Sequence, residues 1–374
     1  MTIDRRALLA GAAGLAAASL GPSAVRAAAA PGRANRLIVN ALGGLSDPNV
    51  EGADDPYSPR VLAEARESGV TAINCTFGYV AGPDDPFEAS VRDVARADAL
   101  LRRHPADLLK VFGAADIRRA GAERKIGILY GFQNGAMLGE DASRVDLFAD
   151  MGVRIFQLTY NPANRLGDGA MAPENRGLTP FGREVVERLN AQRMIVDLSH
   201  SGERTCLEAA RLSAAPISIN HTGCRAVTDL PRNKTDAELR LVAERGGFVG
   251  IYFMPFLARS GRARATDVVA HIDHAVNICG EDHVGIGTDG TVTAIDDLHA
   301  YQAVLAKEIA ERRAAGISAA GERPDTYPFV VDLRGPGQFF RLIDLLSAHG
   351  YSSGRIEKIM GLNFLRHAET VWGS

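Results

Sequence analysis

The chain has 374 residues, of which 42 are basic and 45 are acidic, so its formal net charge is −3 at pH 7. This balance removes the usual electrostatic case for a nucleic-acid partner or an anionic membrane surface. Hydrophobic residues make up 46% of the chain and charged residues 23%. That is an ordinary globular composition, so we expect a sizeable buried core.

The first thirty residues resemble an export signal rather than part of the fold. The pair Arg5-Arg6 precedes an apolar stretch over residues 7–20, and small residues follow it, which is the layout of a cleavable secretory signal. The stretch is shorter than the roughly 20 residues of a spanning helix, so we expect a chain that is not membrane-spanning. Paired arginines are typical of the bacterial twin-arginine signal, although Asp4 stands where that signal usually has Ser or Thr. For residues 1–30 we predict a twin-arginine signal peptide and hence a periplasmic protein, with the general secretory route as the alternative.

Eight short apolar runs recur along the rest of the chain, and they are apolar throughout rather than alternating. They are Leu37–Leu42, Val70–Thr76, Ile126–Phe132, Val153–Thr159, Met194–Ser199, Pro216–Asn220, Phe248–Phe253 and Val284–Thr288. Such runs are typical of parallel strands that are buried on both faces. Helical patterns lie between them, at Pro59–Ser68, Phe87–Arg103, Ala142–Met151, Thr179–Gln192, Gly202–Ser213, Thr235–Arg245 and Thr266–Gly280. Eight strands that alternate with helices predict an α/β fold, a (β/α)8 TIM-like barrel, rather than a doubly wound sheet.

The end of the chain departs from this alternation. Residues 300–328 are more polar, and we interpret them as an excursion between the last strand and two closing helices. Those helices are expected over residues 337–346 and 355–366. Because the sequence contains no fixed-period repeat, we predict a single domain over residues 31–374.

The four cysteines are Cys75, Cys206, Cys224 and Cys279, and no two of them form a Cys-x-x-Cys pair. The sequence therefore encodes neither a disulfide framework nor a zinc ribbon. Cys75 and Cys279 lie in apolar runs and are expected to be small buried hydrophobic residues. Whether two of the four cysteines form a single disulfide is left open by the sequence.

Polar residues follow several of the predicted strands at their carboxyl ends, where the chemistry of such a barrel takes place. His200 follows the fifth run, His221 the sixth and Asp289 the eighth. Imidazole and carboxylate groups are natural zinc ligands, and neighbouring parallel strands bring their ends close to one another. The pattern therefore indicates a metal site, with hydrogen-bonded core histidines as the alternative.

Other polar residues are expected at the same mouth. Gln133 follows the third run and offers an amide, which brings no charge to balance a divalent ion. Tyr160 and Asn161 follow the fourth run and could donate to an oxyanion or orient a substrate, or simply satisfy the strand end. Arg232 lies in a loop beyond His221, where its planar guanidinium suits a substrate carboxylate. The alternative for Arg232 is an ordinary exposed arginine.

Taken together, these segments resemble the membrane (renal-type) dipeptidase family of zinc peptidases. The matching segments are Leu158–Asn161, Gly167–Gly169, Gly177–Gly182, Val196–His200, His221–Asn233, His283–Asp289 and Gly361–Phe364. They occur in order and span most of the chain. The family fold is a metal-bearing α/β barrel, in agreement with the eight predicted strands.

The resemblance implies hydrolysis of dipeptides at a two-zinc centre. His200 and His221 match the two histidines of one zinc site, and Asp289 matches the aspartate that binds the other zinc and helps in proton transfer. Arg232 matches the arginine that holds the substrate carboxylate. Tyr160 lies where many relatives carry a histidine that polarises the carbonyl. The resemblance also allows a homodimer.

Three positions depart from the family pattern. Relatives end the first strand with a His-x-Asp pair, whereas Leu42 and Gly44 stand at those positions here. The metal-bridging glutamate corresponds to Gln133. We therefore expect one zinc ion, held by the two histidines and Asp289, or none.

Three functions remain compatible with these residues. The first is a single-metal hydrolase that acts on dipeptides or related small amides, and it is the one we favour. The second is a catalytically altered or inactive family member that takes part in periplasmic maturation of a peptide-derived metabolite. The third is a protein that binds such a ligand through Arg232 without turnover. Fold alone does not choose among them, because function depends on the site.

Overall fold

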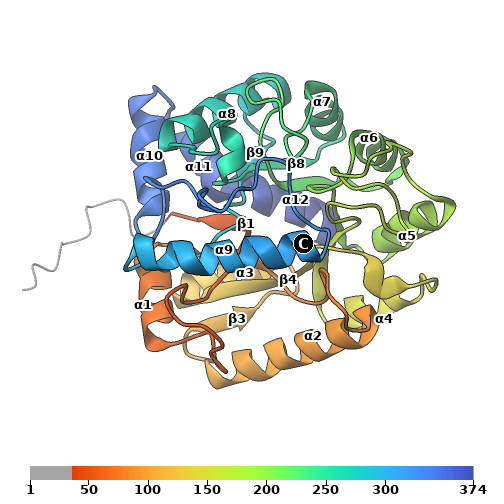
Figure 1. Cartoon of the computed structure of the whole chain (residues 1–374), viewed down its shortest axis with the longest axis horizontal. Helices are drawn as coiled ribbons and strands as arrows, with labels where there is room; N and C mark the ends of the chain where they lie inside the picture. The colour runs from red at the N-terminus through yellow and green to blue at the C-terminus, as the bar shows by residue number, and fades with distance from the viewer. Residues whose placement is uncertain (1–35, 374) are drawn as a thin grey trace, which may run out of the picture. The chain divides into compact units, whose positions relative to one another are not determined.

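The computed structural model describes residues 36–373 (Figure 1), so the expected export signal lies outside the described residues. The strands are β1 Val39–Gly43, β2 Ala72–Thr76, β3 Leu108–Lys110, β4 Ile126–Phe132, β5 Val153–Gln157, β6 Ile195–Asp197, β7 Ser218–Thr222, β8 Phe248–Ile251 and β9 Val284–Ile286. The α-helices are α1 Pro59–Glu67, α2 Pro86–Arg103, α3 Ala114–Glu123, α4 Arg144–Asp150, α5 Pro180–Ala191, α6 Glu203–Leu212, α7 Asp236–Glu244, α8 Ala265–Cys279, α9 Leu298–Ala314, α10 Gln338–Ala348, α11 Ser353–Glu357 and α12 Asn363–Trp372. Short turns of 3-10 helix lie at η1 Ala136–Leu138 and η2 Pro255–Leu257, and a π-helical turn lies at η3 Lys358–Leu362.

Eight of these strands form a parallel barrel in the order β1-β2-β4-β5-β6-β7-β8-β9. Just beyond β9 and β1 the barrel closes through backbone hydrogen bonds. The amide of Asp289 donates to the carbonyl of Leu42 (2.9 Å), and the amide of Gly44 donates to the carbonyl of Gly290 (3.1 Å). Helices surround the strands (Figure 1). The predicted (β/α)8 fold is confirmed.

The structure adds two elements that the apolar pattern did not predict. Strand β3 pairs with the first half of β4 and lies off the main strand order, while β5 pairs with the second half of β4. Helix α3 follows β3. Strand β3 was missed because Leu108–Lys110 is only three residues long with one buried side chain, too short for a recognisable run.

The barrel interior changes from apolar to polar along its length. At the amino ends of the strands, Leu129, Ile195 and Phe248 form a cluster with Phe364 and Trp372 of α12, which closes that end. Residues two positions apart share a strand face. The side chains of Asn74, Gln157 and Asp197 are polar and buried. Each lies two residues further along its strand than an apolar member of this cluster. The barrel interior is therefore filled with apolar side chains at the amino ends of the strands and with polar side chains near their carboxyl ends.

Several local predictions can be checked against the described residues. Thr179 caps α5, because its hydroxyl accepts a hydrogen bond from the amide of Gly182 (2.9 Å). All four cysteines are buried and free, so the open question of a disulfide is answered in the negative. The polar excursion contains α9, a helix of 17 residues. Within residues 36–373, no helix has both the length and the apolar character that crossing a bilayer requires.

Candidate active site

The barrel places the predicted site residues at one end. His200 follows β6, His221 lies in β7, and Asp289 follows β9. Tyr160 and Gln133 follow β5 and β4. All five stand at the carboxyl ends of parallel strands, where a barrel of this type carries its site.

His200 is oriented by its neighbours. Its Nδ1 lies 2.7 Å from Oδ1 of Asn161, and its Nε2 is buried with no hydrogen-bond partner among the described residues. Because an amide oxygen only accepts, Nδ1 carries the proton and Nε2 keeps a free lone pair. The ring of Tyr160 stacks on this imidazole, with centroids 4.2 Å apart. A hydrogen bond from the other ring nitrogen to a neighbouring oxygen is how proteins orient a metal-binding histidine.

Both the oxygen and the nitrogen of the Asn161 side-chain amide form hydrogen bonds with other residues of the chain. Besides its contact with His200, its Nδ2 donates to the carbonyl of Ile317, 2.7 Å away. The predicted role of Asn161 in substrate binding stays a prediction; in this structure its side chain positions His200. It also ties the segment after α9 to the mouth of the barrel.

His221 lies beside His200, with ring centroids 4.9 Å apart. Its Nε2 is 3.4 Å from the side-chain nitrogen of Gln133, and its Nδ1 is buried without a partner among the described residues. Its backbone amide donates to the hydroxyl of Ser199 (3.0 Å). Gln133 lies at the mouth, as its place after the third predicted strand indicated, and there it contacts His221.

Both imidazoles are held in the neutral form. Burial lowers the pKa of His200 and of His221 well below the usual value, and the positive charge of Arg232 lowers both further. A neutral imidazole keeps a lone pair that can bind a metal. Their state at pH 7 therefore suits ligation.

Asp289 lies on the far side of the mouth in a strained backbone conformation. Its φ is +57°, in the left-handed region that few residues other than Gly, Asn and Asp adopt. Burial raises its pKa to about 6, and the charges of Arg232 and Arg312 oppose part of that rise. Strain together with a raised pKa is typical of a functional carboxylate.

Tyr160 keeps its proton over the physiological range. Burial raises the pKa of its phenol to about 12, and the negative charge of Asp289 adds to that rise. Its hydroxyl is therefore a hydrogen-bond donor at neutral pH.

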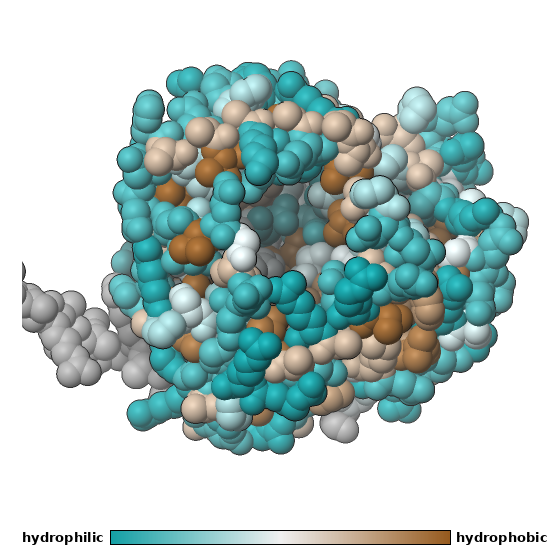
Figure 2. Space-filling view, turned by 60° about the horizontal axis from the view of Figure 1, so that its bottom comes forward, coloured by the Kyte–Doolittle hydropathy of each residue, from teal (hydrophilic) through white to brown (hydrophobic). Residues whose placement is uncertain are grey.

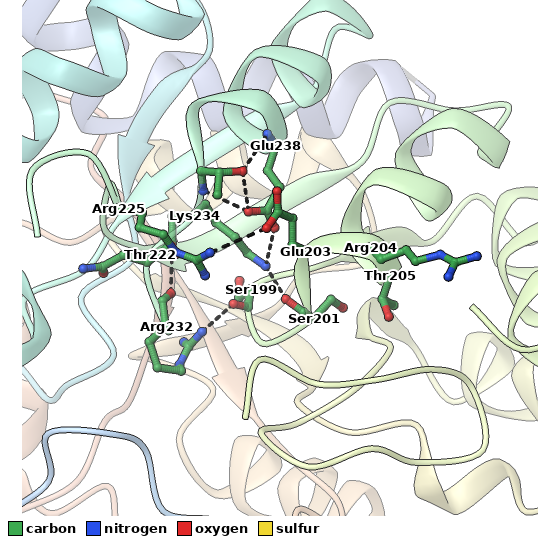
Figure 3. Close-up of polar contacts among 12 residues, drawn as sticks. Ser199, Ser201, Glu203, Arg204, Thr205, Thr222, Arg225, Arg232, Lys234 and Glu238 are labelled. Atoms are coloured by element: carbon green, nitrogen blue, oxygen red, sulfur yellow. Dashed lines mark hydrogen bonds and ion pairs between the residues drawn. The ribbon is translucent and has the colours of Figure 1, made fainter. Parts of the chain in front are cut away.

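Arg232 and a second cation of the same loop brace the segment that carries His200 (Figure 3). Arg232 donates from Nη1 to the carbonyl of Ser199 (2.5 Å), and Lys234 donates from Nζ to the carbonyl of Ser201. These carbonyls belong to the residues immediately before and after His200. Arg232 is buried, and no other described residue accepts a hydrogen bond from its guanidinium. Its remaining N–H groups are thus available for a ligand.

Lys234 also forms a buried ion pair within the chain. Its Nζ lies 3.1 Å from Oε1 of Glu238, with side chains 3% and 1% exposed. Glu238 in turn accepts hydrogen bonds from the backbone amide and the hydroxyl of Thr235, both 2.9 Å away, in the capping box of α7. The helix start, the ion pair and the His200 segment therefore form one connected unit.

The sequence reasoning did not identify Lys234. Lys234 stands two residues after Arg232, but the two are joined by a turn, so no strand or helix period marked Lys234 as part of the site. It also did not foresee that the region around α9 lines a cavity of about 150 Å³ next to Asp289. Figure 2 shows one face of the molecule deeply hollowed, with both hydrophilic and hydrophobic walls.

The donor set fits a metal ion only in part. His200 offers a buried Nε2 without a partner among the described residues, whereas the lone pair of His221 lies on Nε2, which faces the side-chain nitrogen of Gln133 at 3.4 Å. At the end of β1, however, Leu42 and Gly44 contribute only backbone hydrogen bonds to barrel closure. Among residues 36–373, no three His, Cys, Asp or Glu side chains are gathered closely enough to hold a metal. A metal would need Asp289 to approach the histidines.

Comparison with known proteins decides the family. The model of the membrane dipeptidase family, peptidase family M19, matches residues 59–320. The chain belongs to this family. The resemblance carried by the sequence motifs is confirmed, and with it the general classification as a hydrolase of the dipeptidase type.

Two relatives illustrate the range of similarity. An uncharacterized protein in the pqqA 5′ region of Klebsiella pneumoniae is 29% identical over 301 residues, which cover 78% of this chain and 98% of the relative. Dipeptidase tcpJ of Claviceps purpurea is 31% identical over 247 residues, which cover 63% of this chain and 58% of the relative.

Solved structures agree on the fold. An amidohydrolase from Pseudomonas aeruginosa is 30% identical with a TM-score of 0.78, covering 91% of this chain and 98% of that one. A metallopeptidase from Rhodobacter sphaeroides, liganded with a phosphinate mimic of the dipeptide L-Ala-D-Ala, is 22% identical with a TM-score of 0.70, covering 90% of this chain and 100% of that one. The latter similarity concerns the barrel alone.

Proposed function

We propose that the chain hydrolyses dipeptides or related small amides at a reduced centre that holds a single zinc ion. The observation that carries the proposal is the pair His200 and His221. Both are buried at the barrel mouth and held neutral; Nε2 of His200 has no partner among the described residues, and Nε2 of His221 meets only the side-chain amide of Gln133, 3.4 Å away. Asp289 is the third ligand in this proposal. A zinc ion held there would act as a Lewis acid toward the scissile carbonyl.

The chain's own residues supply the remaining chemistry. The Tyr160 hydroxyl stays protonated, because its pKa is about 12. It donates a hydrogen bond to the carbonyl oxygen, where negative charge develops. Asp289, with a pKa of about 6, is ionised in most molecules at pH 7, and its carboxylate accepts the proton that the attacking water molecule loses.

Substrate binding is assigned to groups on the His200 side of the mouth. Arg232 binds the C-terminal carboxylate of the substrate through the guanidinium N–H groups that Ser199 leaves free. Gln133 presents its amide beside His221 and binds the substrate backbone. A periplasmic location, supported by the signal pattern of residues 1–30, is part of the proposal.

The proposal is tested by assaying release of free amino acids from neutral dipeptides such as Ala-Ala, with zinc supplied. The double variant His200→Ala/His221→Ala should fall to background. The control is His274→Gln, because His274 bonds Asp236 (2.7 Å) at the start of α7 and lies in none of the site contacts. It should retain wild-type turnover. Equal turnover in the double variant would refute the assignment.

A second candidate is a ligand-binding protein without turnover. It is favoured by the absence of a gathered group of three metal ligands among the described residues and by the side chains at positions 42, 44 and 133. In the same assay this candidate predicts no hydrolysis by the wild type, together with saturable dipeptide binding that is lost in Arg232→Gln.

A further inference from the structure

The cavity next to Asp289 is lined by Asp289 itself and otherwise by parts of the chain that His200 and His221 do not use. Phe253 follows β8, Tyr301 comes from α9, and Phe329, Leu333 and Arg334 come from the segment before α10. Its volume of about 150 Å³ is that of a cavity able to hold a benzene-sized group. A side chain of about six heavy atoms fits such a space.

Tyr301 and Phe329, two rings of the cavity lining, belong to an aromatic cluster that Tyr327 completes from outside the lining. Phe329 lies 5.8 Å from Tyr301 and 5.1 Å from Tyr327, centroid to centroid. The hydroxyl of Tyr327 donates to the carbonyl of Leu298 (3.1 Å) at the start of α9. The cluster is thus fixed to α9 by packing and by a hydrogen bond.

Arg334 is the cation of this cavity, and its charge is not neutralised within the described residues. Its Nε donates to the carbonyl of Val331 (3.2 Å), and its guanidinium lies 5.8 Å from the centre of the Phe329 ring. No carboxylate of residues 36–373 lies within ion-pair distance of it. The nearby Arg262 and Arg264 differ, because each pairs with an aspartate. An unpaired guanidinium beside an aromatic ring suits a carboxylate ligand.

The position of the cavity indicates which part of a substrate reaches it. Its lining comes from the ends of β8 and β9, from Pro48 after β1, and from the region of α9 and α10. Arg232 instead donates to Ser199, which follows β6. If Arg232 holds the C-terminal carboxylate, the side chain at the other end of a dipeptide points toward the cavity. The two arginines then bind two different carboxylates.

We propose that this cavity is the subsite for the side chain of the N-terminal residue, and that Arg334 makes the site selective for dipeptides whose N-terminal side chain is acidic. The inference rests on the proposed function for the location of the scissile bond. Phe329, Leu333 and Arg334 lie beyond residues 59–320, which the family model matches, so membership of the family does not by itself imply this subsite.

The experiment compares Glu-Ala, Gln-Ala and Ala-Glu as substrates of the full chain with zinc supplied. The wild type should prefer Glu-Ala over Gln-Ala by about tenfold in kcat/KM, since a hydrogen bond to a charged group contributes about 1.5 kcal/mol or more. Arg334→Gln should abolish this preference and leave Ala-Glu unchanged. Arg334→Glu should favour Lys-Ala instead. The control Arg262→Gln, at an exposed arginine outside the cavity lining, should behave as wild type.

Failure of the inference and failure of the proposed function give different results. If the wild type hydrolyses neutral dipeptides but treats Glu-Ala and Gln-Ala alike, or if the preference survives in Arg334→Gln, the subsite is refuted while the hydrolase stands. If no dipeptide is hydrolysed, the same peptides are titrated by calorimetry. Tighter binding of Glu-Ala than of Gln-Ala, lost in Arg334→Gln, then supports the subsite without the hydrolase. Equal or absent binding overturns it.

Discussion

At the scale of single residues, burial sets the chemistry of the mouth. It keeps the two histidines neutral, holds the proton on Tyr160 and raises the pKa of Asp289. The same cause therefore prepares ligands, a hydrogen-bond donor and a proton acceptor. Two consequences can be measured separately from metal binding.

The first concerns stability as a function of pH. The pKa of Asp289 is raised from its ordinary value of 3.8 to about 6 in the folded chain. Folding therefore disfavours the carboxylate, so the stability of the wild type falls as the pH rises between those two values. Asp289→Asn removes this penalty. The Tm of Asp289→Asn minus the Tm of wild type should therefore be larger at pH 8 than at pH 4. Both values are measured with a chelator present.

The matched control is Asp229→Asn, at a carboxylate that is 70% exposed, which reports the general effect of losing a surface charge. The same Tm difference for Asp289→Asn at both pH values would contradict a buried, raised carboxyl.

The second residue-scale prediction concerns Tyr160. Tyr160→Phe keeps the ring that stacks on His200 but removes the hydroxyl. Removing one donor to a developing oxyanion lowers kcat roughly 100-fold. We expect that loss with unchanged zinc content, measured by steady-state kinetics and elemental analysis on the same sample. A full kcat in Tyr160→Phe would remove this residue from the reaction.

At the scale of elements, the start of α7 is coupled to the site. Lys234 joins the capping box of α7 to the carbonyl of Ser201, beside His200, and its partner Glu238 is almost fully buried. Removing one member of such a pair leaves the other charge uncompensated. The pair therefore contributes to stability as a unit.

This coupling predicts a non-additive pair of substitutions. Lys234→Met should lower the free energy of unfolding by about 3–5 kcal/mol, because Glu238 remains buried and charged. Lys234→Met/Glu238→Gln should recover part of that loss. Denaturant unfolding of both single variants and the double variant forms the cycle. Strictly additive effects would show that the two side chains act independently.

The elements also show how far the sequence could predict the structure. The strand runs and the capping residue Thr179 were predictable, because burial on both faces and a cap hydrogen bond leave local signals. Strand β3 was not, since three residues show no periodicity. Convergence of the site residues followed from parallel topology. The bracing by Lys234 and the cavity around Arg334 depend on how loops fold back over the mouth, which no local pattern encodes.

At the scale of the whole molecule, the barrel gathers the site from strands that are distant in sequence. Leu42 and Gly44 close the barrel through their backbone, but they cannot serve as the ligands that the family places there. A metal ligand added at the end of another strand therefore cannot replace the ligands that are missing at the end of β1.

This arrangement predicts the outcome of a simple reversion. Gln133→Glu restores the carboxylate after β4 but adds nothing at positions 42 and 44. We expect the variant to bind no second zinc ion, measured as zinc per chain at saturation. Two ions per chain together with full dipeptidase turnover would refute the idea that one metal site has been lost as a whole.

The most direct test of the central claim is the zinc content of the folded protein, purified without added metal or chelator. A single-metal centre predicts about one zinc ion per chain, absent from His200→Ala/His221→Ala and retained in His274→Gln. Zinc that persists in the double variant, or a wild type that neither contains nor takes up zinc on titration, would contradict the account.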